Sequence, residues 1–349
     1  MISEESLSRH YEGCRVLVTG ICGTVGREVL RQVMAMDPKL VVGIDNNESE
    51  LFFLGQEYDG DPRVRLFLGD LRDRSSLVER FRNVEVVIHT AAFKHVGLCE
   101  HSPRDAMLTN IVGTQNVIDA ATACGIQRVL FTSTDKAVNP TNVMGTSKLM
   151  GERLMTAGNV ERRDGQPIFA STRFGNVLGS RGSVIPVFRQ QIARGGPVRL
   201  TSSEMTRFIM TLEEAVLLVL QSVFLAQGGE VFVTKMPILR IEDLAHVMIE
   251  VLAPRHGYRP EEIAVELIGT RPGEKMYEEL LNDEETRRVV ETEKYFIILP
   301  ATRPIDPGVS SAYPKVVGLG SPEPYNSSTR EAMSRDELRA YLLRHRLLD

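Results

Sequence analysis

The stretch "CRVLVTGICGTVGREVL", residues 14–30, predicts how the chain begins to fold. Its first part is a short apolar, β-branched run that ends in glycine, and its last part has apolar residues at helical spacing. Gly20, Gly23 and Gly26 form a G-x-x-G-x-x-G pattern between the two. Glycines at a strand-to-helix turn let the backbone approach a pyrophosphate, which then faces the helix N-terminus. The stretch therefore predicts a dinucleotide-binding unit.

The same alternation of strand and helix continues through the first half of the chain. Strand-like runs end near residues 46, 70, 92 and 134, with helical segments between them, the longest predicted at 102–125. Near-continuous apolar strands that alternate with helices are typical of a parallel sheet covered on both faces. We therefore predict an α/β fold, a doubly wound, Rossmann-like parallel sheet.

The pattern becomes irregular after about residue 173, where glycine and proline cluster. We expect a strand, helix, strand and helix between residues 230 and 281, and a final helix near 329–346. The predicted division is a dinucleotide-binding Rossmann domain at 1–175, to which some later segments return. A smaller α/β lobe with a helical tail at 176–349 is expected to bind the substrate.

Composition excludes several classes of protein. The chain has 349 residues, a net charge of -5 and no tryptophan, and no basic patch is interleaved with aromatics, so no nucleic-acid partner is expected. Its four cysteines form no C-x-x-C pair, which favours reduced thiols and no metal site. The N-terminus is too polar for a signal peptide, and the apolar run at 215–226 is shorter than a membrane span. We expect a soluble, cytoplasmic protein.

Asp45 indicates which dinucleotide binds. It ends the second predicted strand, where a carboxylate can hold a ribose 2'-hydroxyl and would repel a 2'-phosphate. NAD is therefore expected rather than NADP, although Arg72 or Arg74 could offset the repulsion. "GDLRD" (69–73) and "HTAA" (89–92) end the next two strands, at the same carboxyl edge of the sheet.

"STDKAVNPTNVMGTSK", residues 133–148, has Y-x-x-x-K spacing with Met144 at the tyrosine position. With the glycine turn, this stretch resembles the extended short-chain dehydrogenases. More narrowly, residues 12–282 are similar to nucleotide-sugar 4,6-dehydratases of polysaccharide biosynthesis, above all the UDP-N-acetylglucosamine type. The stretches that carry this likeness are "DNNESELF" (45–52), "AAFKHVGLCEHSPRDAMLTNIVGTQNVIDAA" (91–121), "RFGNVLGSRGSVIPVF" (173–188), "TRF" (206–208) and "RPGEKMYEELL" (271–281).

The resemblance implies a reaction in three stages. A hydride leaves sugar C4 for the cofactor, water is lost across C5 and C6, and the hydride returns to C6. Asp135 is implied as the acid, Lys136 as the base and Thr134 as a partner of the 4-hydroxyl, while Lys148 holds the nicotinamide ribose. A lysine is a base only where its pKa is lowered, and an ion pair with its neighbour Asp135 would oppose this.

Met144 cannot act as an acid or a base, because a thioether carries no exchangeable proton. We expect it to pack against the sugar or the nicotinamide. The 4-hydroxyl proton is then expected to leave through Asp135, Lys136 or a water linked to Thr134.

The resemblance also implies the binding residues. The cofactor set consists of Gly20, Gly23, Thr24, Val25, Gly26, Asp45, Asn46, Asp70, Leu71, Ala91, Ala92, Lys94, Asn110 and Lys148. The substrate set consists of Lys94, His95, Met144, Arg173, Asn176, Val184, Arg199, Arg207, Arg271 and Glu274. Arginine forks suit phosphate oxygens, the Asn176 amide suits a diphosphate, and the Glu274 carboxylate suits a ribose hydroxyl. His89 and His95 are expected to have no catalytic role.

Two other functions stay open. A 4- or 5-epimerase could use the same scaffold, although a C4 epimerase would want the tyrosine that Met144 replaces. A non-catalytic nucleotide-binding protein is the more distant alternative. UDP is expected over GDP, and retention at C5 over inversion. By resemblance, the chain is expected to form a homodimer or a larger homo-oligomer.

Overall fold

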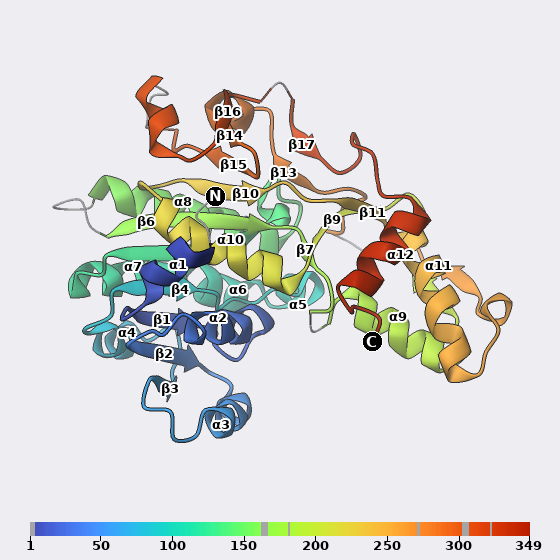
Figure 1. Ribbon diagram of the computed structural model, residues 1–349, viewed down its shortest axis with the longest axis horizontal. Helices are drawn as coiled ribbons and strands as arrows, with labels where there is room; N and C mark the ends of the chain where they lie inside the picture. Colours follow the sequence, from blue (N-terminus) through green and yellow to red (C-terminus); the bar gives the residue numbers. More distant parts are fainter. Residues whose placement is uncertain (1–3, 162–166, 181, 271–272, 302–306, 322) are drawn as a thin grey trace.

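The computed structural model describes residues 4–161, 167–180, 182–270, 273–301, 307–321 and 323–349. Its centre is a ten-stranded sheet in the order β16-β14-β15-β10-β6-β5-β4-β1-β2-β3 (Figure 1). The seven neighbouring strands β10, β6, β5, β4, β1, β2 and β3 run parallel to one another. Strand β15 pairs antiparallel with β10, β14 with β15, and β16 with β14. The strands are β1 (Arg15–Thr19), β2 (Leu40–Asp45), β3 (Val64–Leu68), β4 (Val86–His89), β5 (Arg128–Thr134), β6 (Ile168–Phe174), β10 (Val231–Thr234), β14 (Val289–Thr292), β15 (Tyr295–Ile298) and β16 (Val316–Leu319).

Helices cover both faces of this sheet because successive side chains of a strand point to opposite faces. In β1, Val16 and Val18 join the core under α1, α2 and α10, whereas Leu17 joins the core under α4, α7 and α8. The predicted doubly wound α/β fold is confirmed. These helices are α1 (Glu4–Tyr11), α2 (Thr24–Met34), α3 (Glu48–Glu57), α4 (Arg74–Phe81), α7 (Gly113–Cys124), α8 (Val143–Glu161) and α10 (Leu212–Leu225).

A second core lies beside the large sheet and is built from small sheets and three helices (Figure 1, right). Ile185, Phe188, Leu244 and Leu338 are buried there. The elements are β7 (Asn176–Val177), β9 (Thr206–Met210) and β11 (Ile238–Arg240) in one sheet, β8 (Val198–Leu200) and β12 (Val265–Leu267) in another, and α9 (Val184–Ala193), α11 (Ile241–Leu252) and α12 (Arg335–Arg344). Strands β10 and β14–β16 return to the large sheet, and a domain boundary at residue 175 stays a prediction.

Two predicted helices differ from the structure. The helix expected at 102–125 is split into α6 (Pro103–Met107), a π-helical turn η1 (Leu108–Val112) and α7. The helix expected to end at residue 281 is wrong. Those residues form strand β13 (Glu279–Leu281), which pairs with β17 (Tyr325–Asn326) and buries Leu280 and Leu281. A partner strand more than 40 residues away outweighs the local helical spacing.

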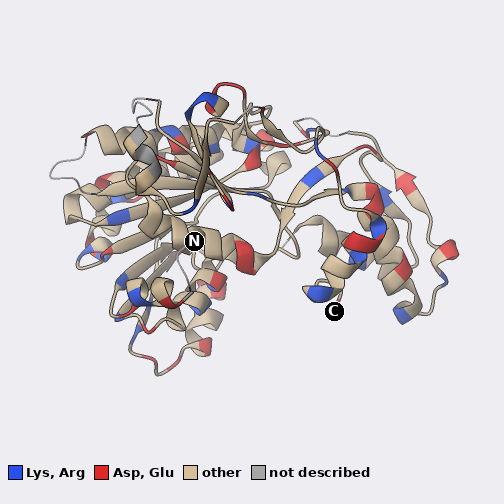
Figure 2. Ribbon diagram, turned by 45° about the horizontal axis from the view of Figure 1, so that its top comes forward, with Lys and Arg blue, Asp and Glu red and all other residues tan. Residues whose placement is uncertain are grey.

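The remaining short helices complete the chain. They are α5 (Val96–His101), η2 (Asp135–Ala137), η3 (Ala253–His256), η4 (Pro260–Glu262), η5 (Glu285–Arg288) and η6 (Pro307–Ala312). Among the described residues, no helix combines the length and apolarity that crossing a membrane requires. Basic and acidic residues are interspersed along the ribbon (Figure 2).

Arg173 at the end of β6 is a buried charge centre that ties three elements together. Its side chain is 1% exposed and donates to Glu152 of α8 at 2.8 and 2.9 Å and to Glu285 of η5 at 2.7 and 2.8 Å. It also donates to the Leu280 carbonyl at 3.0 Å. A buried charge is tolerated only when it is paired and hydrogen-bonded, so this arginine fastens the 280–285 segment to the sheet.

We expect Arg173→Leu to lower the free energy of unfolding by about 3–5 kcal/mol, because two carboxylates would stay buried without a counter-charge. Urea unfolding followed by circular dichroism measures the change. Arg199→Leu is the matched control, because it removes the exposed Arg199–Glu266 pair; a change of at most about 0.5 kcal/mol is expected there. Equal effects of the two substitutions would contradict the structural role of Arg173.

Candidate active site

The glycine turn between β1 and α2 is packed so tightly that side chains cannot enter. A Cβ atom at Gly26 would lie 2.2 Å from the Gly20 carbonyl oxygen, and one at Gly20 would lie 2.7 Å from the Ala91 backbone. Gly20 also has a φ of 71°, which favours glycine. Helix α2 begins at Thr24, directly after this turn. Gly20 and Gly26 thus allow the backbone to pack closely at the N-terminus of α2, in the kind of turn at which a pyrophosphate binds.

Asp45 lies beside this turn and is held in place. Its carboxylate accepts hydrogen bonds from the backbone N–H groups of Cys22, at 2.9 Å, and Asn47, at 3.0 Å. Asp45 lines a cavity of roughly 290 Å³. From the predicted cofactor set, the cavity also contacts Gly20, Gly23, Asn46, Asp70, Leu71, Ala91 and Ala92.

The two arginines that could offset Asp45 have acidic partners. Arg72 binds Asp70 through several hydrogen bonds of 2.5 to 3.0 Å, and Arg74 lies 3.1 Å from Asp119. Their charges are therefore largely compensated, and the cavity beside Asp45 keeps its acidic character.

A larger cavity of roughly 980 Å³ adjoins the first and shares Gly23, Thr90, Ala92 and Phe93 with it. Its walls come from the turn after β1, the ends of β4, β5 and β6, the start of α8, and the loop before α9. Predicted residues that line it are Gly23, Thr24, Val25, Gly26, Ala92, Lys94, His95, Thr134, Lys136, Met144, Lys148 and Asn176. The structure thus brings most of the predicted cofactor set to two adjoining cavities, together with Lys94, His95, Met144 and Asn176 of the predicted substrate set.

At the carboxyl end of β5, Thr134, Asp135 and Lys136 form a connected cluster. The Thr134 hydroxyl donates to Asp135 Oδ1 at 2.8 Å, and Lys136 Nζ donates to the same oxygen at 2.9 Å. Thr134 and Lys136 line the large cavity, whereas Asp135 is fully buried behind them. Asp135 Oδ2 has no hydrogen-bond partner among the described residues.

Glu278 is a residue of this cluster that the sequence interpretation missed. It directly precedes β13, its side chain is 2% exposed, and its Oε1 lies 3.4 Å from Lys136 Nζ and 3.8 Å from Arg207 Nε. Its backbone is fixed by Ser327, whose hydroxyl accepts from the Glu278 N–H at 2.9 Å. The wrong helix prediction hid this residue, because a helix would not have carried Glu278 to the end of β5.

The two carboxylates control the protonation of Lys136. Burial lowers the pKa of Lys136, but Asp135 and then Glu278 outweigh it, so that the pKa lies above its ordinary value. Burial also raises the pKa of Glu278; Asp135 adds to this effect, and the nearby cations oppose it. Lys136 is therefore an ammonium group at neutral pH, and Glu278 is a carboxyl group with increased affinity for a proton.

Lys148 and Met144 lie one helical turn apart at the start of α8. Lys148 Nζ donates to the Thr132 carbonyl at 2.8 Å and stands 4.5 Å from the centre of the Phe131 ring. Burial lowers the pKa of Lys148 to about 8, against the opposing effect of Glu152. Met144 is 3% exposed and packs with Cys99 and Ala106, which is the apolar packing expected of a thioether.

Asn110 supports the cavity from behind. It belongs to the π-helical turn η1 and is 1% exposed. Its amide accepts from the Phe93 N–H at 2.8 Å and donates to the Phe93 carbonyl and the Ser147 hydroxyl, both at 2.9 Å. Asn110 therefore shapes the loop after β4, and Phe93 in that loop lines both cavities.

The histidines differ in position. His89 is fully buried between the hydroxyls of Thr19 and Thr114, at 2.7 and 3.1 Å, and burial together with Lys148 lowers its pKa to about 3. A neutral, hydrogen-bonded histidine of this kind has a structural role. His95 lines the large cavity.

The predicted substrate arginines within the described residues, Arg173, Arg199 and Arg207, do not line the cavity. Arg173 is enclosed by two carboxylates, which argues against contact with a ligand. Arg207 donates to the carbonyls of Thr206, Lys275 and Met276 at 2.7 to 3.3 Å, and Arg199 pairs with Glu266. Arg271 lies outside the described residues.

Two other predicted substrate residues, Asn176 and Glu274, each have a side-chain oxygen that could accept a hydrogen bond from a ligand. Asn176 Oδ1 and Glu274 Oε2 are buried and have no hydrogen-bond partner among the described residues. Asn176 lines the large cavity, so its amide is placed to bind a polar ligand. Val184 is the first residue of α9, next to Ser183 in the cavity wall.

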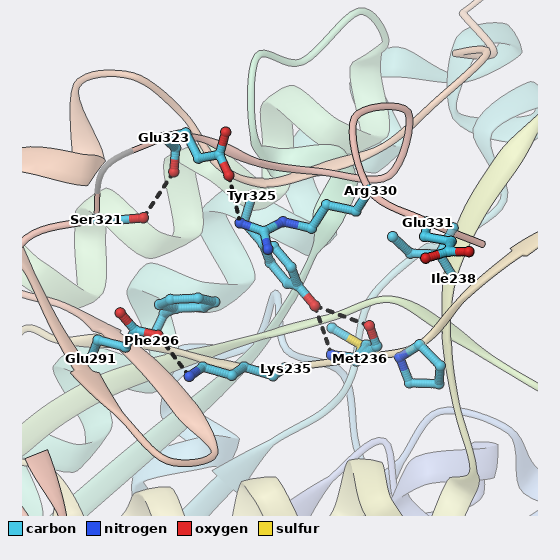
Figure 3. A pocket seen from close by; sticks show the side chains of 11 residues that line it. Lys235, Met236, Ile238, Glu291, Phe296, Ser321, Glu323, Tyr325, Arg330 and Glu331 are labelled. Carbon is cyan, nitrogen blue, oxygen red and sulfur yellow. Dashed lines mark hydrogen bonds and ion pairs between the residues drawn. The ribbon is translucent and has the colours of Figure 1, made fainter. Parts of the chain in front are cut away.

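A separate hollow of roughly 490 Å³ lies where the large sheet meets the second core (Figure 3). The Tyr325 hydroxyl accepts from the Met236 N–H at 2.9 Å and donates to the Met236 carbonyl at 3.0 Å. Four charged side chains that line this hollow form two ion pairs, Lys235 with Glu291 and Arg330 with Glu323. This arrangement fixes the link between β10 and β11 and is typical of a structural joint.

The comparison with protein families identifies the chain. The model of the family described as "Polysaccharide biosynthesis protein" matches residues 16–300. The chain belongs to this family. The match covers the glycine turn, both cavities and the Thr134–Lys136 cluster, and it confirms the resemblance seen in the sequence.

Curated relatives of this family member include proteins with different activities. An uncharacterized membrane protein of Methanocaldococcus jannaschii is 47% identical over 296 residues, which are 85% of this chain and 89% of the relative. A Campylobacter jejuni UDP-N-acetylglucosamine 4,6-dehydratase (inverting) is 36% identical, over 83% of this chain and 84% of the relative. A UDP-glucose 4-epimerase of Rickettsia felis is 34% identical, over 94% and 95%. The chain spans about half the length of two polysaccharide biosynthesis proteins, from Bacillus subtilis and Staphylococcus aureus.

Solved structures confirm the fold of this family member. The X-ray structure of Pen from Bacillus thuringiensis is 39% identical, covers 97% of this chain and 99% of its own, and has a TM-score of 0.89. A dTDP-glucose 4,6-dehydratase from Streptomyces venezuelae, solved with NAD, is 23% identical with a TM-score of 0.66, covering 75% of this chain and 86% of its own; it shows the shared fold alone.

The lowered pKa of Lys148 predicts that Lys148→Met stabilises the protein. The native pKa of about 8 lies below the ordinary 10.5, so burying the charge costs roughly 3 kcal/mol below pH 8, and wild-type stability rises between pH 8 and 10.5. Losing the hydrogen bond to Thr132 costs about 1 kcal/mol. We therefore expect a net gain of about 1–2 kcal/mol at pH 7 from urea unfolding, which shrinks as the pH rises.

Lys39→Met is the control for this measurement, because Lys39 is exposed. It should leave the pH dependence of stability unchanged. A Lys148→Met variant that is less stable than wild type at pH 7 would show that burial of the ammonium is not costly.

Proposed function

We propose that the chain catalyses the NAD-dependent 4,6-dehydration of a nucleotide-activated N-acetylhexosamine, with UDP-N-acetylglucosamine as the substrate. The observation that carries the proposal is the hydrogen-bonded Thr134–Asp135–Lys136 cluster, of which Thr134 and Lys136 line the same cavity as Met144, a residue that cannot exchange a proton. An acid and a base side by side suit an elimination, in which one group is protonated while a neighbouring carbon loses a proton. The Campylobacter dehydratase supports this choice.

The residues at the smaller cavity fit a dinucleotide. Two glycines stand where a Cβ would collide with backbone, and Asp45 is oriented by two backbone N–H groups. Asp45 would hold the adenosine ribose, which favours NAD, and Lys148 would hold the nicotinamide ribose. NAD bound there would supply the hydride acceptor for sugar C4 and the hydride donor for C6.

Thr134 and Asp135 give the 4-hydroxyl proton a route that does not need a tyrosine. The Thr134 hydroxyl faces the cavity and already donates to Asp135. It can accept the 4-hydroxyl proton while passing its own to Asp135, which becomes a carboxylic acid. That proton can then return through the Thr134 hydroxyl, which lines the cavity, to the departing 6-hydroxyl. Asp135 thus has the role of acid that the resemblance implies, reached through Thr134.

Lys136 is the proposed base for the C5 proton. Its amine lines the cavity, and the 4-ketone makes the C5 proton acidic. Because Lys136 takes and returns this proton on one face of the sugar, we propose retention at C5. The Campylobacter relative is named as inverting, which is the opposite stereochemical outcome at C5. Assembly into a homodimer or larger oligomer remains part of the proposal.

An epimerase is the second candidate, since the Rickettsia relative aligns with 94% of this chain. A 4-epimerase and the dehydratase both need an acid–base group at O4, which Thr134 and Asp135 can supply without a tyrosine. Of these two, only the dehydratase needs a base at C5, so Lys136 in the cavity wall favours dehydration. Incubation with NAD and UDP-N-acetylglucosamine separates the two activities. We expect a product that is lighter than the substrate by one water in mass spectrometry. A product of unchanged mass would support the epimerase and overturn the dehydratase.

Substitutions in "TDKAVNPTNVM" (134–144) test the assignment of roles. Lys136→Met should lower kcat by at least about 10³-fold, because elimination loses its base. NAD binding, measured by calorimetry, should change little. Met144→Leu is the control and should retain activity within about tenfold, because it keeps a packed apolar group. A larger loss in Met144→Leu than in Lys136→Met would contradict the proposed roles.

A further inference from the structure

The proposed dehydration needs Lys136 as a neutral amine, but its surroundings stabilise the ammonium form. To act as a base at C5, its amine must be neutral, while Asp135 must be ionised to receive the 4-hydroxyl proton. In the structure Lys136 is flanked by two carboxylates, Asp135 Oδ1 at 2.9 Å and Glu278 Oε1 at 3.4 Å. Both stabilise the ammonium form. One proton must therefore leave Lys136 without going to Asp135.

Glu278 is the group that can receive it. The carboxyl is almost fully buried, and its Oε2 has no hydrogen-bond partner among the described residues. Its backbone is held by Ser327 in both directions, with the Glu278 N–H donating to the hydroxyl and the Ser327 N–H donating to the Glu278 carbonyl, each at 2.9 Å. The backbone of Glu278 thus fixes the position of its carboxyl group, whose Oε2 is available to accept a proton.

We propose that Glu278 is a positioning residue that accepts the proton of Lys136, so that the amine is neutral while Asp135 remains ionised. One N–H bond of the ammonium breaks and one O–H bond forms on Glu278, and no electrons change hands. The proton returns to Lys136 after turnover. This inference rests on the proposed dehydration, and it adds a residue that acts through Lys136 without contacting the sugar.

The charge balance of the cluster favours this transfer. The charged groups that face Lys136 and Glu278 are Asp135, Arg207 from β9 and Lys275 from the loop before β13. Lys275 also lies 3.8 Å from Glu279. Moving one proton from Lys136 to Glu278 leaves the summed charge of the cluster unchanged, so no net charge is created in the interior.

Asp135 is the competing acceptor, and two observations disfavour it. Its Oδ1 already accepts from both Thr134 and Lys136, and protonating it would block the route from the 4-hydroxyl. Burial raises the pKa of Glu278, which increases its affinity for the proton. The 3.4 Å separation must shorten slightly for transfer, as is common for catalytic contacts in structures without substrate.

The pH dependence of kcat/KM tests the proposal. In wild type the transfer is internal, so the supply of neutral Lys136 does not depend on the pH of the solvent. In Glu278→Gln the amine must lose its proton to solvent. We expect the ratio of variant to wild-type kcat/KM to rise about tenfold per pH unit between pH 6 and 8. A ratio that stays below one but is constant with pH indicates a structural role and overturns the proposal.

Two further variants test whether the pH effect is specific to loss of the Glu278 carboxyl group. Glu279→Gln is the matched control, since Glu279 is next in the chain and contacts Asn139 and Lys275 instead of Lys136; its ratio to wild type should be constant. Glu278→Asp keeps a carboxyl and should also give a constant ratio, at a reduced rate. A rising ratio in Glu278→Asp overturns the proposal, even if Glu278→Gln fails to fold.

The assay separates this inference from the proposed function. Wild type is measured first, by formation of the product lighter by one water. If wild type does not form that product, the proposed dehydratase activity is contradicted. If wild type forms the product but the ratio of Glu278→Gln to wild-type kcat/KM does not change with pH, the proposed dehydratase activity stands. Only the proposed role of Glu278 is then contradicted.

Discussion

The structure depends on one constraint, that charges buried at the carboxyl edge of the sheet must be paired. Lys136 after β5 and Arg173 at the end of β6 are both cations in low-dielectric surroundings. Their partners, Glu278 and Glu285, come from a single later segment. Pairing both cations holds that segment against the sheet. The same ion pairs therefore stabilise the fold and set the chemistry of the site.

In the proposed dehydration, Met144 stands in place of a tyrosine, so the proton chemistry is assigned to the end of β5 and not to α8. Lys148, one turn further along α8, remains buried with a lowered pKa, while Thr134, Asp135 and Lys136 supply exchangeable protons in a connected row. Met144 itself packs among apolar side chains. In the proposed dehydration, the transfer from Lys136 to Glu278 leaves the summed charge of the buried cluster unchanged.

Sequence reasoning succeeded where the signal was local. The glycine turn, Asp45 and the cluster at 134–136 each lie at a strand end, and parallel strands bring their carboxyl ends to one edge; the structure places them around adjoining cavities. It failed where a long-range partner decided the outcome. The helical spacing before residue 281 gave way to pairing of β13 with β17, and Arg207 turned toward backbone carbonyls of the neighbouring segment.

The sequence by itself determined the α/β fold, the dinucleotide turn and the identity of the groups at the end of β5, because strand and helix periodicity and glycine requirements act within a few residues. Only the tertiary structure decided that Asp135 lies behind Thr134, that Arg173 is a structural charge centre, and that Glu278 reaches Lys136 from 142 positions further along the chain. The physical reason is that burial and electrostatic pairing depend on which distant segments meet, and local patterns carry no information about those encounters.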